Sequence, residues 1–410
     1  MTLIEILDKD PIENMVSCIA LKPDKVLFIG EAAELRRQIP VYTEFAEKRH
    51  YKTEFLCRAV DFSRIDSTVT AVTEALSEDD DCVFDLTGGD DLGLVALGIA
   101  LERLKNEKRV RVHRFDIKKS IAVAIDGDGD MPYRGSVAIG VNDSICLYGG
   151  LPIYPSNEFA SPSDWVASEK MTRAVDAVWE LCRQNPQLWN TSVTALKEFE
   201  KYRTFVDNPM RVVVTSRMSG GVKNRADKLK KVKRLLEKLS ARGLVTSYET
   251  RNGEFSYTYG SAYAKHCLEK AGNILEIKML MLAREIKNGD GSPYFTDART
   301  GVSIDWNTDS YYSVPTCNEI DVILMRGLVP VFISCKNGSV GDDELYKLHT
   351  VAERFGGRYA KKVLVASEIP KSQKSLEYFM RRAEDMNITV INDVYMMSDE
   401  QIKNKLRALA

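Results

Sequence analysis

Apolar runs alternate with helix-like segments through the first third of the chain, and this alternation limits the fold more than any other feature. Strands and helices that follow one another at this spacing form a parallel sheet with right-handed crossovers. The pattern predicts a Rossmann-like, doubly wound α/β domain over residues 1–150, with ligands at the carboxyl ends of its strands. The expected strands cover 3–7, 25–29, 53–57, 82–86 and 110–115, and the expected helices cover 11–21, 31–49, 63–77 and 91–105.

Three loops at predicted strand ends are candidate ligand-binding loops. The most distinctive is Thr87-Gly88-Gly89-Asp90-Asp91, which ends a strand and opens a helix. Its glycines let a backbone approach closely, and free amides at a helix N-terminus favour phosphate. The other two loops contain Asp8-Lys9 and Gly30-Glu31. A tight βα turn of the kind found in any α/β domain is the alternative explanation. Neither a dinucleotide-binding Gly-x-Gly-x-x-Gly nor a P-loop motif is present.

Composition excludes few classes but sets useful bounds. The 410 residues suffice for two or three domains, and a net charge of -2 means that any contact with nucleic acid is local. No apolar run approaches the ~20 residues that span a bilayer, and the acidic, strand-like N-terminus does not indicate a signal peptide. The eight cysteines form no Cys-x-x-Cys pair and the four histidines are scattered. We therefore expect free thiols in the reducing cytoplasm and no His-rich metal site. The Asp126–Asp130 stretch lacks the Glu of a calcium loop, so we expect a hairpin turn there.

Acidic and basic residues are paired on two apolar segments near the C-terminus. Residues two apart on a strand share a face, so Glu319 lies with Asp321, and Ser334 lies with Lys336. A hairpin that turns at Gly327-Leu328 places Asp321 opposite Ser334. Such a cluster can hold a divalent metal and activate water against a phosphodiester. The alternative is that these are ordinary polar residues at strand ends.

This pattern resembles the PD-(D/E)xK nuclease core, in which a helical acid precedes an Asp and a Glu-x-Lys on two strands. Asp321 and Lys336 match the Asp and the Lys, whereas Ser334 replaces the Glu. The resemblance implies that Glu276 is the helical acid, with Glu269 as its rival, and that Glu319 compensates for Ser334. It implies a catalytic set of Glu276, Asp321, Ser334 and Lys336, and Mn²⁺ or Mg²⁺ held by Glu276, Glu319 and Asp321. Lys336 would orient or deprotonate the attacking water.

The Thr87-Gly88-Gly89 loop, set in a Rossmann-like domain, resembles the CRISPR-associated Rossmann fold, or CARF, sensor domain. These domains bind cyclic oligoadenylates, usually across the two-fold axis of a dimer. The resemblance implies a homodimer with ligand contacts from the three loops: Asp8, Lys9, Gly30, Glu31, Thr87, Gly88, Gly89 and Asp91. Asp90 and Asp91 depart from the family, which often has a basic residue there, and both fit a helix N-cap. Lys9 and Arg134 are candidate positive partners.

The middle region, residues 151–260, begins with a proline-rich linker and contains a basic run. Helices are expected near 164–184 and 190–206. Between Arg211 and Arg242 there are 11 Lys or Arg and two acids, a local charge of +9. A helix, a strand and an Asn252-Gly253 hairpin follow in an order that resembles a winged-helix module. Its basic face suits a nucleic-acid backbone, and the alternative is a solvated connector.

The C-terminal third, residues 261–410, is expected to complete a nuclease-like α/β core. The predicted helices cover 262–286, 342–355 and 372–386, and the later strands cover 362–366 and 388–391. A CARF-like sensor before such a core resembles the ancillary effector nucleases of type III CRISPR systems. The resemblance implies an endonuclease that cuts DNA or RNA when cyclic tetra-adenylate binds the dimer and shifts its population to a competent state. A ligand-controlled transcription regulator with a degenerate nuclease domain is the alternative.

Overall fold

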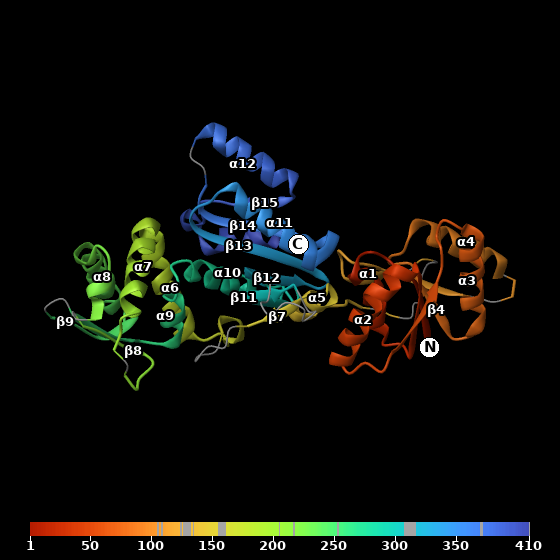
Figure 1. Ribbon diagram of the computed structural model, residues 1–410, viewed down its shortest axis with the longest axis horizontal. Helices are drawn as coiled ribbons and strands as arrows, with labels where there is room; N and C mark the ends of the chain where they lie inside the picture. The colour runs from red at the N-terminus through yellow and green to blue at the C-terminus, as the bar shows by residue number, and fades with distance from the viewer. Residues whose placement is uncertain are drawn as a thin grey trace.

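The computed structural model describes most of the chain: residues 1–104, 106–107, 110–123, 125, 133, 135–154, 161–204, 206–215, 218–251, 254–306, 317–369 and 372–409. The stretch 126–130 and Arg134 lie outside these residues. Figure 1 shows three parts in a row, with the N-terminal sheet at one end, the C-terminal sheet in the centre and a small sheet at the other end. Within the described ranges, no helix is both long and apolar enough to cross a membrane.

The N-terminal sheet has the strand order β3-β2-β1-β4-β5-β6, and only β6 is antiparallel to its neighbour. The predicted Rossmann-like alternation is confirmed. Apolar residues on both faces of the sheet pack against helices, which is why its strands read as continuous apolar runs. The elements are β1 (Thr2–Ile6), α1 (Pro11–Leu21), β2 (Lys25–Gly30), α2 (Ala32–Lys48), β3 (Glu54–Ala59), α3 (Ile65–Glu78), β4 (Cys82–Asp85), α4 (Asp91–Leu104), β5 (Arg111–Asp116) and β6 (Ile121–Val123).

The C-terminal sheet has the order β15-β14-β13-β12-β11-β7 and mixes parallel and antiparallel pairs. Strand β7 pairs with β11, so residues 151–153 lie in this sheet although the sequence division at 150 assigned them to the middle region. Its elements are β7 (Leu151–Ile153), β11 (Asp297–Asp305), β12 (Cys317–Arg326), β13 (Val329–Ser339), α11 (Asp342–Gly356), η3 (Gly357–Tyr359), β14 (Lys361–Glu368), α12 (Gln373–Asp385), β15 (Ile388–Ile391), η4 (Val394–Met396) and α13 (Asp399–Arg407).

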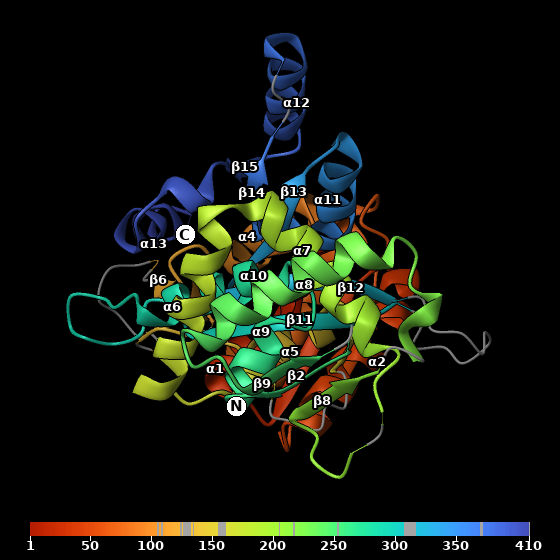
Figure 2. The same cartoon turned by 90° about the vertical axis from the view of Figure 1, so that its left-hand side faces the viewer.

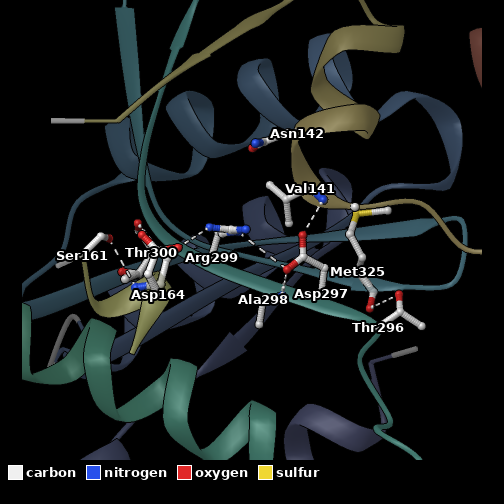
Figure 3. Close-up of polar contacts among 12 residues, drawn as sticks. Val141, Asn142, Ser161, Asp164, Thr296, Asp297, Ala298, Arg299, Thr300 and Met325 are labelled. Atoms are coloured by element: carbon white, nitrogen blue, oxygen red, sulfur yellow. Dashed lines mark hydrogen bonds and ion pairs between the residues drawn. The ribbon is translucent and has the colours of Figure 1, made fainter. Parts of the chain in front are cut away.

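Residues on both sides of the proline-rich stretch expected as a linker, from α5 (Val141–Leu147) to η1 (Pro162–Asp164), are docked on β11 (Figure 3). Asp297 accepts the amide of Val141, the first residue of α5, at 2.9 Å. Arg299 pairs with Asp164, at the end of η1, also at 2.9 Å. These contacts join residues more than 130 positions apart. The described part of the segment is thus held by polar contacts with one strand.

The two faces of the C-terminal sheet bury different neighbours. Val322 and Leu324 face a core shared with the middle region, whereas Ile323 and Met325 face a core shared with α11 and the N-terminal domain. Successive residues of a strand point to opposite faces. In both views α12 projects from this sheet (Figures 1 and 2).

The middle region contains a three-stranded antiparallel sheet in the order β8-β10-β9 beside three helices. Helix α7 begins at Pro186, earlier than predicted, because Asn185 caps it and proline suits the first helical position. Strands β9 and β10 pair from Arg251 and Glu254 outward, and Asn252-Gly253 lies outside the described residues. The elements are α6 (Glu169–Gln184), α7 (Pro186–Glu200), β8 (Arg211–Val214), η2 (Met218–Gly221), α8 (Arg225–Ser240), β9 (Val245–Arg251) and β10 (Glu254–Tyr259).

The single helix predicted over 262–286 is wrong, because the chain forms α9 (Ala262–Cys267) and α10 (Asn273–Glu285) with a turn between them. Side chains satisfy backbone carbonyls at the break. The carbonyl of His266 accepts the side-chain amide of Asn273, and that of Ala271 accepts the indole N–H of Trp189, both at 3.1 Å. The apolar pattern continues on both sides of the turn, so sequence periodicity did not reveal it.

The turn between β12 and β13 depends on Gly327, whose φ is 62°. A Cβ at this position would lie 2.2 Å from Ser120 Oγ, whereas a Cβ at Gly301, which has the same φ, would meet nothing within 4 Å. We expect Gly301→Ala to lower the free energy of unfolding by about 1–2 kcal/mol through backbone strain alone. Gly327→Ala should cost roughly 1–3 kcal/mol more because of the clash. Urea denaturation of both variants measures the difference, and equal losses would contradict the steric account.

Candidate active site and ligand pocket

The strands β12 and β13 separate beyond Val322 and Ile333, and Asp321 lies at this point, which we call the fork. Their paired register ends at Val322 and Ile333, although both strands continue beyond it. Asp321 Oδ2 accepts the amide of Cys335 at 2.6 Å and the hydroxyl of Ser334 at 3.2 Å. The structure therefore places Asp321 opposite Ser334, as the hairpin geometry predicts.

Lys336 brings a positive charge to the fork. Its Nζ lies 3.6 Å from Asp321 Oδ2 and 3.1 Å from Glu344 Oε2. Burial lowers the pKa of Lys336, but these two carboxylates outweigh the burial and raise the pKa above its usual value. The ammonium is therefore charged at neutral pH. Sequence reasoning missed Glu344, which lies in the first turn of α11 among acids that suit a helix N-terminus.

Glu276, in the first turn of α10, faces the same charges. Burial, then the carboxylates of Asp321 and Glu319, raises its pKa from the ordinary value of 4.5 to about 8. Burial also raises the pKa of Asp321, although Lys336 and the amide of Cys335 act against it. Two carboxyl groups thus share a poorly solvated space, where a proton or a cation relieves their repulsion.

Glu319 and Glu269 are placed differently from Glu276. The side chain of Glu319 is half exposed and pairs with Lys270 Nζ at 3.3 Å. Its charge still contributes to the raised pKa of Glu276. Glu269 lies in the turn before α10 rather than on it. Burial raises the pKa of Glu269, but a contact with His266 at 3.3 Å and nearby cations outweigh burial and lower it. Of the two rival acids, only Glu276 acts electrostatically with Asp321 here.

Two carboxylates at the fork could serve as ligands for a small divalent cation. Among the described residues, no three His, Cys, Asp or Glu side chains are grouped closely enough to hold a metal. Mg²⁺ usually keeps several waters and takes only one or two protein carboxylates together with substrate phosphates. Glu276 and Asp321 supply such a pair, and burial, together with nearby carboxylates, raises the pKa of both groups. Glu319 is engaged with Lys270 instead.

A pocket of about 360 Å³ lies where the order of the N-terminal sheet reverses, beyond the ends of β1 and β4. Of the eight predicted ligand contacts it is lined by Asp8, Lys9, Glu31, Gly89 and Asp91. The other three do not line it. Gly30 and Gly88 lie where a Cβ would come within 2.8 Å of Leu7 and Glu13, respectively. Thr87 accepts the amide of Phe115 at 2.8 Å and donates to Asp85, so it holds β4 to β5.

The backbone N–H of Gly89, which we expected to be free for phosphate, already donates to a carboxylate. Asp8 Oδ2 accepts the N–H of Gly89 at 3.0 Å, and Asp8 Oδ1 accepts the N–H of Asp10 at 2.8 Å. Asp90 Oδ1 accepts the amide of Leu92 at 3.0 Å, which supports the capping interpretation of that residue. The pocket also contains more acids than cations, its cations being Lys9 and Arg358.

Arg358 comes to this pocket from the C-terminal domain, and sequence reasoning missed it. Its guanidinium lies 3.5 Å from Asp8 and 3.9 Å from Asp10, and it pairs with Glu13. Its backbone N–H donates to Asp10 at 3.1 Å. These partners lie about 350 residues away in sequence, so no local pattern could have revealed the contact.

The raised pKa of Glu276 has a consequence for stability. The folded protein keeps the Glu276 proton up to about pH 8, whereas the unfolded chain releases it near its ordinary value. The contribution of Glu276 to the free energy of unfolding is therefore present below about pH 4.5 and is lost as pH rises to about 8. Glu276→Gln lacks this loss, so its stability relative to the parent should increase with pH across that window. Denaturant titrations at several pH values test this, with exposed Glu249→Gln as the control, and a pH-independent difference would contradict it.

Comparison with known proteins supports the fold. No protein-family model matches the chain, and no curated protein matches it in sequence. Among solved structures, protein VC1899 from Vibrio cholerae superposes with a TM-score of 0.72 at 16% identity, covering 99% of this chain and 97% of that one. Can2 from Sulfobacillus thermosulfidooxidans, solved in complex with cyclic tetra-adenylate, superposes with a TM-score of 0.62 at 17% identity, covering 100% and 96%. The chain shares its fold with both proteins over nearly its whole length.

Proposed function

We propose that this protein is a metal-dependent endonuclease that a cyclic oligoadenylate activates, acting in type III CRISPR defence. One observation carries the catalytic part of the proposal. Glu276 and Asp321 share a poorly solvated fork with raised pKa values, beside the charged ammonium of Lys336. Paired carboxylates and a lysine are the groups that metal-dependent phosphodiester hydrolysis needs.

Each residue at the fork has a distinct role in this proposal. Glu276 and Asp321 would hold Mn²⁺ or Mg²⁺, which supplies an activated water and neutralises charge on the phosphate. Ser334 and the Cys335 amide donate to Asp321 and fix the orientation of its carboxylate. Lys336 is charged, so it donates a hydrogen bond to the attacking water or to a phosphate oxygen rather than accepting a proton. Glu319 would bind the metal only after leaving Lys270.

The activator in this proposal is cyclic tetra-adenylate, bound by a homodimer at the strand ends of the N-terminal domain. The likeness of the fold to Can2, which was solved with that molecule, supports this part. Lys9 and Arg358 are the cations that line the pocket beside the Gly89 loop. Because Asp8 now occupies the Gly89 amide, a phosphate that takes this amide must displace the Asp8 carboxylate. Binding of a polyanion here should weaken as salt rises.

A transcription regulator with an inactive nuclease domain is the second candidate function. Ser334 stands where the PD-(D/E)xK pattern has an acid, and the β8-β10-β9 sheet with the basic α8 has the arrangement of a winged helix. In that case nucleic acid binds but is not cut.

A cleavage assay separates these functions. Supercoiled plasmid, single-stranded DNA and single-stranded RNA are incubated with Mn²⁺, with and without cyclic tetra-adenylate. We expect cleavage only with the ligand. Asp321→Asn should reduce the rate by roughly a hundredfold or more, because it removes a metal ligand and one of the two carboxylates that hold Lys336. Calorimetry should show unchanged binding of cyclic tetra-adenylate.

Asp290→Asn is the matched control, since Asp290 is an exposed carboxylate in a turn outside the fork. Cleavage by Asp321→Asn at the parental rate would show that the assignment of the site is wrong. Cleavage that does not depend on the ligand would indicate a stand-alone nuclease. Ligand binding without any cleavage would favour the regulator.

A further inference from the structure

A groove of about 200 Å³ lies between α6, α7 and α8, and its rim is basic. Lys231, Arg234 and Lys238 line it from one face of α8, at positions i, i+3 and i+7. Glu237 is the acid of this lining. None of the three cations forms an ion pair with a carboxylate in the described part of the chain, whereas Lys228 on the same helix pairs with Glu198. The groove therefore presents uncompensated positive charge.

The groove adjoins the candidate active site through the first turns of α7. Trp189 lines the groove and donates its indole N–H to the carbonyl of Ala271 at 3.1 Å, next to the residue that precedes α10. Asn190 donates to the carbonyl of Asn337 at 2.6 Å, and Asn337 directly follows Lys336. Asn337 in turn donates to the Ala271 carbonyl at 3.1 Å. One turn of α7 thus forms a wall of the groove and a support of the fork.

A nucleic-acid substrate needs a cationic surface outside the fork. Glu319 pairs there with Lys270, Asp321 with Lys336, and Glu344 with Lys336 and Lys347. Glu276 keeps its proton up to about pH 8, so the fork offers no surplus of positive charge to a phosphate backbone. The net charge of the chain is -2, so it offers no general attraction. Binding energy for a polyanion must therefore come from a local patch of lysine and arginine, and α8 provides one beside the fork.

We propose that Lys231, Arg234 and Lys238 bind the phosphate backbone of the nucleic-acid strand that enters the fork, with the α6–α8 groove as its path. That the bound nucleic acid is the substrate rests on the proposed nuclease function. That α8 binds nucleic acid rests only on the basic residues of the groove. The basic face of α8 then acts on substrate affinity, while Glu276, Asp321 and Lys336 act on the chemical step.

The test removes the three charges together by Lys231→Gln, Arg234→Gln and Lys238→Gln. Binding is measured by fluorescence anisotropy with labelled single-stranded and duplex oligonucleotides at several salt concentrations, in an Asp321→Asn background that prevents cleavage. We expect affinity to fall roughly tenfold or more, and the slope of log K against log salt to decrease by about 2–3, since each phosphate contact contributes about 0.7–0.9. In the cleaving background KM should rise, while kcat and the affinity for cyclic tetra-adenylate stay unchanged.

A matched triple variant controls for the loss of charge. Arg36, Lys52 and Lys374 are exposed cations on other parts of the chain, and their change to Gln should alter neither affinity nor salt dependence. Equal melting temperatures of the two triple variants would show that the fold is intact, and Lys231→Arg, Arg234→Lys and Lys238→Arg should retain binding.

The outcomes separate this inference from the proposed function. If the α8 variant binds nucleic acid with the parental affinity and salt slope, the inference is overturned, whether or not the protein cuts. If the parent binds no nucleic acid, it is overturned as well. If the parent binds through α8 but never cuts, the inference stands and the nuclease proposal fails.

Discussion

The carboxylate of Asp321 is the group on which the candidate active site depends. The ladder between β12 and β13 stops at Val322 and Ile333, and Asp321 accepts the next amide, that of Cys335. A buried amide without an acceptor costs about 1–3 kcal/mol, so the carboxylate stabilises the point at which the strands part. The fork in turn keeps that carboxylate poorly solvated and close to Lys336. One side chain therefore ends the ladder and supplies negative charge to the site.

Helix α11 connects the fork with the strand-end pocket of the N-terminal domain. Glu344 in its first turn pairs with Lys336, and Arg358, two residues beyond its end, pairs with Asp8 and Glu13. A helix of 15 residues spans about 22 Å and is stiff over that length. The two charged sites are thus joined by one rigid element, in addition to the apolar core that the two domains share.

Charge is divided among separate regions of the molecule, which the near-zero net charge conceals. Acids gather at the fork and at the strand-end pocket, whereas Lys231, Arg234 and Lys238 of α8 form no ion pair with a carboxylate among the described residues. Carboxylates at the fork suit a cation, and they would make a poor binding surface for a polyanion. In the proposed function, the basic helix α8 would attract the nucleic acid, while α10, β12 and β13 would carry the groups that cut it.

The sequence alone determined the features that arise from neighbouring residues. Strand–helix alternation fixed the N-terminal sheet, and the turn at Gly327-Leu328 placed Asp321 opposite Ser334, because periodicity and turn chemistry act over a few positions. Tertiary structure alone decided the break before α10, where Trp189 bonds to Ala271 across 82 positions, and the pairing of Glu319 with Lys270. It also brought Glu344 to Lys336 and Arg358 to Asp8. Charged partners distant in the chain leave no periodic pattern, so only packing of the whole fold selects them.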